Sequence, residues 1–286
     1  LFTFFVSGKM WVTQPYNGHL SAAAMGEIKD RNGTVLATTQ EGRRVYNADE
    51  TIRTALLHTV GDDDGFISTS AQASMRAKLN GYNPITGLSK TPFNNIGNSA
   101  KLTIDADLCA TAYSAMGDQR GSVILYNYEN GEIICKVSTP SFDPANKPED
   151  ISENSYYEGV YVDRSLTSSY TPGSIFKLVT QSAAMDMWPN DWQNKQYTCN
   201  GSAEIGGKTV TCMGTHGTIS AQDALGYSCN IYYAYLANDL GNNALQAKAE
   251  QFGFNKQLYF DDVPCSKSAI DMSEASDNDR AWAGIG

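Results

Sequence analysis

The chain has 286 residues, of which 41% are hydrophobic and 18% charged, so it can bury a sizeable core and overall disorder is excluded. Its formal net charge of −10 argues against nucleic acid as a main partner, because such a partner requires a basic face. Six cysteines in this length are too few for a scaffold built on disulfides.

The first hundred residues predict a small β-rich module. Residues 1–6 are apolar but far short of the roughly 20 residues that span a bilayer, so residues 1–8 are either the trailing end of a membrane anchor or a buried first element. Residues 26–39 place Asn-Gly between two β-prone segments, which predicts a hairpin. Residues 70–80 predict a short helix, and the Gly-, Pro- and Asn-rich residues 81–98 predict a linker.

A second pattern of hairpins and helices begins at Leu102. The expected elements are a helix at 105–116, a hairpin at 121–138 around Asn-Gly, a long loop at 139–173, a buried helix at 174–187, a helix at 220–239 that Gly241 ends, and a helix at 243–252. Helices alternate with hairpins and not with single strands. The sequence therefore predicts an α+β fold with an antiparallel sheet.

The strongest candidate for chemistry is the pair Ser174 and Lys177, which share one face of the predicted helix. A serine needs a neighbouring base to act as a nucleophile, and a lysine can be that base only when its amine is neutral. In the first helical turn, the backbone N–H groups and the helix dipole favour developing negative charge. The alternative is a serine that starts the helix beside a lysine that reaches solvent, and by itself such a pair arises often by chance.

A second polar group follows at Ser228-Cys229-Asn230. The hydroxyl of Ser228 can relay a proton, and the amide of Asn230 can hold a substrate carbonyl or the lysine. The alternative is an ordinary polar position within the predicted helix at 220–239.

Residues 170–180, Tyr-Thr-Pro-Gly-Ser-Ile-Phe-Lys-Leu-Val-Thr, resemble the active-site segment of penicillin-binding protein transpeptidases. Ser-x-Asn, the Pro-Ser-Phe-Asp-Pro run at 140–144, Leu-Thr-Ile-Asp at 102–105, His-Gly at 216–217 and the Arg-Asn-Gly hairpin also resemble that family, in the same order. The resemblance covers residues 26–44 and 99–286. It implies a penicillin-binding-protein/β-lactamase-like transpeptidase domain at 99–286, preceded by a non-catalytic module at 1–98.

The resemblance also implies a division of labour. Ser174 would attack the penultimate D-Ala carbonyl of a peptidoglycan stem peptide, and an amine from a second stem peptide would resolve the acyl-enzyme. Lys177 would take the serine proton, Ser228 would pass a proton to the leaving amine, Asn230 would fix the substrate amide, and the backbone N–H of Ser174 would donate to the oxyanion. β-Lactams would acylate the same serine, and no cofactor or catalytic metal is expected.

One family motif, Lys-Ser/Thr-Gly on a strand after Ser-x-Asn, is missing from the 286 residues. Only Lys208-Thr209-Val210 looks similar, and it precedes Ser228. We therefore expect a domain that is truncated before its third motif. No glycosyltransferase-like domain precedes residue 99, which favours a monofunctional enzyme held by an N-terminal anchor on the extracytoplasmic face of the bacterial membrane, with a membrane glycan polymerase as a further partner.

Two rival functions stay open beside the D,D-transpeptidase. A class D-like β-lactamase or a D,D-carboxypeptidase shares Ser-x-x-Lys, although the N-terminal module favours the transpeptidase. A non-catalytic penicillin-binding scaffold or sensor is favoured by the missing third motif.

The cysteines present a separate question. Cys199 and Cys212 flank a segment of small turn residues between two β-prone arms, which predicts a hairpin that brings them together. Three states are open: a disulfide, free thiols, or a zinc site completed by His216 or Cys229.

Overall fold

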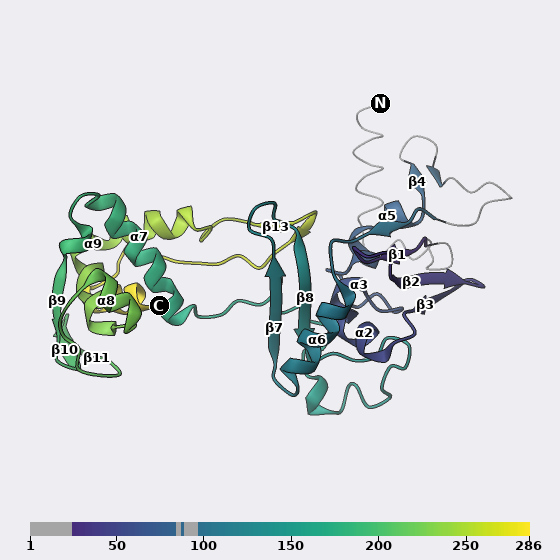
Figure 1. The fold of residues 1–286 in the computed structure, drawn as a ribbon, viewed down its shortest axis with the longest axis horizontal. Helices are drawn as coiled ribbons and strands as arrows, with labels where there is room; N and C mark the ends of the chain where they lie inside the picture. The colour runs from purple at the N-terminus through teal and green to yellow at the C-terminus, as the bar shows by residue number, and fades with distance from the viewer. Residues whose placement is uncertain (1–24, 84–86, 89–96) are drawn as a thin grey trace. The chain divides into compact units, whose positions relative to one another are not determined.

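The computed structural model describes residues 25–83, 87–88 and 97–286 (Figure 1). The described residues form two compact units, which we call the N-terminal unit (the described residues up to 168, with 260–263) and the C-terminal unit (169–259 with 264–286). The expected anchor remnant at 1–8 and most of the expected linker lie outside the described residues. The α+β fold class is confirmed, since both units combine helices with mainly antiparallel strand pairs.

A four-stranded sheet lies in the N-terminal unit. It has the order β3 (Arg43–Tyr46), β2 (Val35–Gln40), β1 (Ile28–Lys29) and β6 (Ala100–Lys101). The expected hairpin at 26–39 is confirmed, because β1 and β2 pair antiparallel. The Asp30 carboxylate fixes its turn by accepting 2.8 Å hydrogen bonds from the backbone N–H groups of Asn32 and Thr34.

β6 pairs parallel to β1, so a strand from beyond residue 98 completes the sheet of the first module. One core cluster includes Ile28 and Leu36 from that sheet together with Cys109 and Val137 from the following segment. The compact N-terminal unit therefore extends across residues 98–99.

Short helices and two hairpins make up the rest of this unit. They are α2 (Glu50–Ala55), α3 (Leu57–Val60), α4 (Ala71–Ser74), α5 (Arg76–Leu79), α6 (Ala106–Met116) and η2 (Ser155–Tyr157), with the hairpins β4 (Tyr82–Asn83)/β5 (Gly87–Leu88) and β7 (Gly121–Tyr126)/β8 (Ile133–Thr139). The helix expected at 105–116 is confirmed, with Asp105 as its N-cap. The helix expected at 70–80 is interrupted at Met75 and forms α4 and α5.

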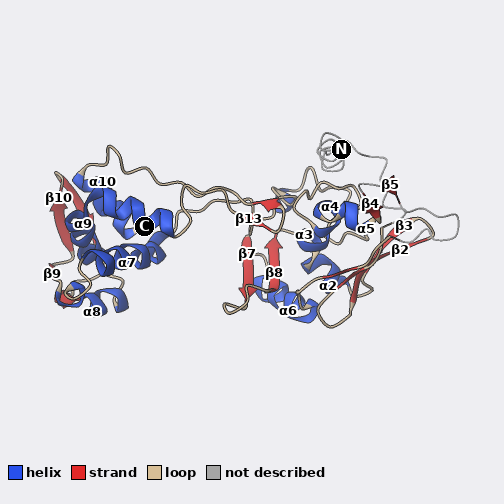
Figure 2. Cartoon of the chain, turned by 90° about the horizontal axis from the view of Figure 1, so that it is seen from above, coloured by secondary structure: helices blue, strands red, loops and turns tan. Residues whose placement is uncertain are grey.

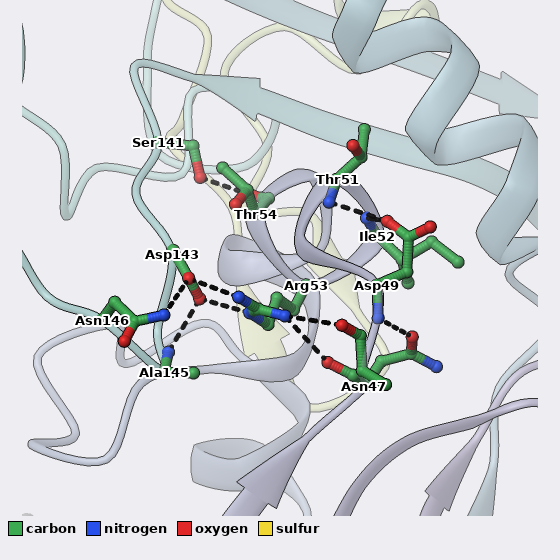
Figure 3. Close-up of polar contacts among 11 residues, drawn as sticks. Asn47, Asp49, Thr51, Ile52, Arg53, Thr54, Ser141, Asp143, Ala145 and Asn146 are labelled. Atoms are coloured by element: carbon green, nitrogen blue, oxygen red, sulfur yellow. Dashed lines mark hydrogen bonds and ion pairs between the residues drawn. The ribbon is translucent and has the colours of Figure 1, made fainter.

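An ion pair fastens the long loop after β8 to α2 (Figure 3). The guanidinium of Arg53 donates to both oxygens of Asp143, at 2.6 and 2.7 Å, and to the carbonyl of Ala48 at 2.9 Å. Both partners are nearly buried, with side chains 12% and 11% exposed. This two-point contact holds the Pro-Ser-Phe-Asp-Pro segment in place.

The C-terminal unit combines small strand pairs with helices. Its elements are η3 (Gly173–Phe176), α7 (Lys177–Met187), η4 (Trp192–Asn194), β9 (Gln196–Cys199), β10 (Ser202–Ile205), β11 (Lys208–Thr211), β12 (Gly217–Ser220), α8 (Ala221–Gly226), α9 (Asn230–Gln251) and α10 (Asp277–Ile285). β9 pairs with β12 and β10 with β11, both antiparallel. One more hairpin, β13 (Tyr259–Phe260) with β14 (Val263–Pro264), includes residues 260–263, which belong to the N-terminal unit.

Three helices, α7, α9 and α10, pack together in this unit (Figure 2). α9 is buried on most sides because it carries Ile231, Tyr233, Leu236 and Leu240, and Gly241 interrupts it with non-helical angles, as the sequence predicts. None of the helices in the described part of the chain is both long and apolar enough to cross a membrane.

Candidate active site

The turn that leads into α7 presents Ser174 at the surface and Lys177 in the interior. Gly173 adopts a φ of 60°, in the left-handed region that a glycine enters without strain, and a 3₁₀ turn carries the chain into α7. Ser174 is exposed, whereas Lys177 is 0% exposed. The three-residue spacing places the Lys177 Nζ 3.1 Å from the Ser174 Oγ.

Ser228 and Asn230 lie at the start of α9, where the structure differs from the helix that the sequence predicts. The helix expected at 220–239 ends with α8 at Gly226 and begins again at Asn230. Ser228 between them has a φ of 51°, an uncommon conformation for a residue other than glycine. Cys229 caps the new helix, because its Sγ accepts the backbone N–H of Tyr232. The helical pattern of the sequence does not predict this break. The break turns the side chains of Ser228 and Asn230 towards Lys177.

All four predicted residues come together around the Lys177 amine. Its Nζ lies 2.9 Å from the Ser228 Oγ, 2.7 Å from the Ser228 carbonyl oxygen and 2.8 Å from the Asn230 Oδ1. The Asn230 Nδ2 donates to the Thr211 carbonyl at 3.0 Å, so β11 orients this amide. The lysine therefore connects the two motifs that the sequence places 51 residues apart.

The surroundings of Lys177 favour a neutral amine. Burial lowers the pKa of Lys177, while the nearby Cys212 and Cys229 thiols act in the opposite direction. Among the described residues no carboxylate forms an ion pair with this amine. A buried amine beside a hydroxyl, with no carboxylate paired to it, is suited to accept a proton.

α10 forms part of the packing behind this site. Gly284 lies so close to α9 that a Cβ added there would be 2.3 Å from the Cβ of Ala237. The Thr180 hydroxyl, one turn after Lys177, donates to the Gly284 carbonyl at 2.8 Å. These contacts fix α7 against α9 and α10, and so hold the lysine in place.

A cluster of three cysteines and one histidine adjoins the site, and the sequence predicts only part of it. Cys199, Cys212, His216 and Cys229 bring one ligand atom each to within 4.8 Å of one another. The expected hairpin between Cys199 and Cys212 is present as β10 and β11, but all six cysteines are free thiols and these two form no disulfide. Of the side chains in the described residues, this group is suited to hold a metal ion.

Residues 121–286, more than half of the chain, match the penicillin binding protein transpeptidase domain. The chain is 31% identical to stage V sporulation protein D of Bacillus subtilis over 140 residues (48% of this chain, 21% of the relative), and 27% identical to the peptidoglycan D,D-transpeptidase PbpA of Mycolicibacterium smegmatis over 219 residues (67% and 44%). It thus spans less than half the length of either relative.

Solved structures share its fold. A D,D-transpeptidase domain from Eggerthella lenta matches with a TM-score of 0.74 and 23% identity, covering 93% of this chain and 62% of that one. The penicillin G acyl-enzyme complex of penicillin-binding protein A from Mycobacterium tuberculosis matches with a TM-score of 0.74 and 21% identity, covering 93% and 67%. Together with the domain match, these findings show that the chain belongs to the penicillin-binding protein transpeptidase family.

Proposed function

We propose that this chain carries the nucleophile of a serine-type D,D-transpeptidase that cross-links peptidoglycan stem peptides and is acylated by β-lactams. The observation that carries the proposal is the position of the Lys177 Nζ, 3.1 Å from the Ser174 Oγ, 2.9 Å from the Ser228 Oγ and 2.8 Å from the Asn230 Oδ1. A single buried amine that contacts two hydroxyls and an amide can move a proton from one hydroxyl towards the other.

The chemistry would run in two steps. Lys177 takes the proton of Ser174 as the serine oxygen bonds to the carbonyl carbon between the last two D-Ala residues of a stem peptide. The C–N bond then breaks, and the departing D-Ala amine receives a proton by way of Ser228. The amine of a second stem peptide attacks the ester, forms the cross-link and releases the Ser174 oxygen, which regains a proton.

The same group of residues would also bind the substrate. Asn230 contacts the substrate amide, and the backbone N–H of Ser174, in the first turn before α7, donates to the oxyanion. We assign these roles to residues 99–286 and a non-catalytic role to 1–98. The proposal places the protein on the extracytoplasmic face of the bacterial membrane, held by an N-terminal anchor, with a membrane glycan polymerase as a partner.

Acylation by a fluorescent penicillin tests the proposal, using the gene product at its full length. We expect one covalent adduct per protein, located by peptide mass spectrometry at Ser174 and lost in Ser174→Ala. Ser182→Ala is the matched control, because it makes the same change at a partly buried position of α7 away from Lys177 Nζ and should leave labelling intact.

The fate of the adduct separates the rival functions. A long-lived adduct supports the transpeptidase, whereas rapid release of hydrolysed antibiotic would favour a β-lactamase. Release of D-Ala from a stem peptide without cross-linking would favour a carboxypeptidase. No adduct in a folded full-length protein would contradict a working nucleophile and leave the scaffold.

A further inference from the structure

An aromatic ring lies beside the amine of Lys177. The ring belongs to Tyr233, which follows Asn230 by three residues on α9 and is 0% exposed. The Lys177 Nζ lies over this ring, 5.8 Å from the ring centroid. An ammonium group within about 6 Å of the centroid is attracted to the negative face of an aromatic ring. Lys177 therefore has an aromatic contact in addition to the polar contacts described above.

A hydrogen bond from α7 fixes the orientation of this ring. Gln181 follows Lys177 by one helical turn, and its Oε1 accepts the Tyr233 hydroxyl at 3.1 Å. Both side chains are buried, and burial raises the pKa of Tyr233, so the phenol stays protonated and can donate. Within the part of the chain that the structure describes, the Gln181 Nε2 has no hydrogen-bond partner. A buried amide with an unpaired donor costs stability, which indicates that its acceptor is required here.

Proton transfer to Lys177 requires a group that favours the ammonium without holding its proton permanently. Burial disfavours the charged amine, so a proton that arrives from Ser174 creates a charge that the surroundings oppose. A carboxylate would remove this penalty, but it would keep the lysine protonated and leave no base. The face of an aromatic ring attracts the ammonium more weakly, and it does not compete with the hydroxyls for the amine hydrogens. The Tyr233 ring has the chemistry that this position requires.

We propose that Tyr233 is a positioning residue whose ring stabilises the ammonium that forms when the Ser174 proton moves to Lys177, and that Gln181 acts through Tyr233 by fixing the ring. The electron pair of the broken O–H bond stays on the Ser174 oxygen, which bonds to the carbonyl carbon. The positive charge appears on Nζ, 5.8 Å from the ring centroid. This inference rests on the proposed function, because it concerns the step in which Lys177 accepts the proton.

Fluorinated phenylalanines at position 233 test the ring. Fluorine withdraws electron density from the ring face and scarcely changes the ring's shape, so a series from phenylalanine through a monofluoro to a trifluoro analogue weakens the attraction in steps. In the full-length gene product, the saturating rate of penicillin acylation should fall along this series by a total of about 2- to 30-fold. The dissociation constant of the initial complex should stay the same. Equal rates with the phenylalanine and trifluoro forms would overturn the role of the ring.

Tyr235 provides the matched control for the fluorinated series. It lies on the same helix, and its ring stacks on Tyr197. The same analogues at position 235 should leave the acylation rate unchanged, and an equal fall there would show that the effect is not specific to the ring beside Lys177. The wild-type protein separates this inference from the proposed function. A folded full-length protein that never acylates contradicts both, whereas acylation at a rate that ignores the fluorine content contradicts the role of Tyr233 alone.

A double substitution tests the part that Gln181 plays. Gln181→Leu leaves the buried Tyr233 hydroxyl without its acceptor, so it should lower stability in urea and slow acylation. Gln181→Leu combined with Tyr233→Phe removes both polar groups and keeps the ring, so the double variant should be more stable and acylate faster than Gln181→Leu alone. A double variant that acylates as slowly as Gln181→Leu would show that Gln181 does not act through the Tyr233 ring.

Discussion

The left-handed backbone at Ser228 predicts a measurable cost in stability. A residue with a Cβ at a φ of 51° loses about 1–2 kcal/mol relative to glycine, which has no such clash. Glycine in turn costs about 0.4–1 kcal/mol through the greater freedom of the unfolded chain. The balance favours Ser228→Gly over Ser228→Ala by about 1 kcal/mol. Both variants lose the same hydroxyl, so their difference isolates the backbone.

Denaturation by urea, followed by tryptophan fluorescence, measures this difference. Trp188, Trp192 and Trp282 all lie in the C-terminal unit, so the signal from these three reports on the part of the chain that contains Ser228. If Ser228 relays a proton as proposed, penicillin acylation should slow to a similar extent in both variants, because both lose that hydroxyl. Equal stability, or a more stable alanine variant, would refute the argument that the break between α8 and α9 stores backbone strain.

Three further changes test the packing and electrostatics. Gly284→Ala should lower the free energy of unfolding by about 1–3 kcal/mol, because the added Cβ would overlap that of Ala237. Gly226→Ala is the control and should not lower it, because a Cβ there meets open space. Equal effects of the two variants would contradict the close packing of α9 and α10. Burial lowers the pKa of His58 to about 4. The unfolded chain therefore takes up a proton near pH 6.5 that the folded chain refuses, and stability should fall by about 3 kcal/mol as the pH drops from 7 to 4. Urea titrations at several pH values, followed by far-UV circular dichroism because His58 and Arg53 lie in the N-terminal unit, should show a shallower fall in His58→Gln. An unchanged slope would contradict this origin. Arg53→Lys keeps the charge but loses the two-point contact of Figure 3, so we expect a loss of about 1–2 kcal/mol by the same denaturation, and no loss would show that the contact contributes little.

The sequence predicted best those features that depend on neighbouring residues. Asn-Gly turns specify both hairpins, Asp105 caps its helix, and Gly241 interrupts α9, because each signal and its effect lie within a few residues. The four candidate residues of the active site were found through motif spacing and the family resemblance, and the structure brings them into contact.

Features that depend on distant parts of the chain were missed. The parallel pairing of β1 with β6 joins segments about 70 residues apart, and no local pattern marks it. The break at Ser228 was missed because serine has no preference for a left-handed backbone, and tertiary contacts with Lys177 accompany that conformation. The grouping of Cys199, Cys212, His216 and Cys229 depends on the positions of β9, β11 and α9, although Cys-x₃-His at 212–216 was a local hint.

The strand β6 has a consequence for how the N-terminal unit holds together. β1 is an inner strand that hydrogen-bonds to β2 on one side and to β6 on the other. The sheet therefore combines strands from before residue 83 with a strand from after residue 97. Cleavage of the backbone between residues 83 and 97 would leave two fragments that share one hydrophobic core. The fragments would therefore stay associated as a non-covalent complex and would not dissociate into separate domains.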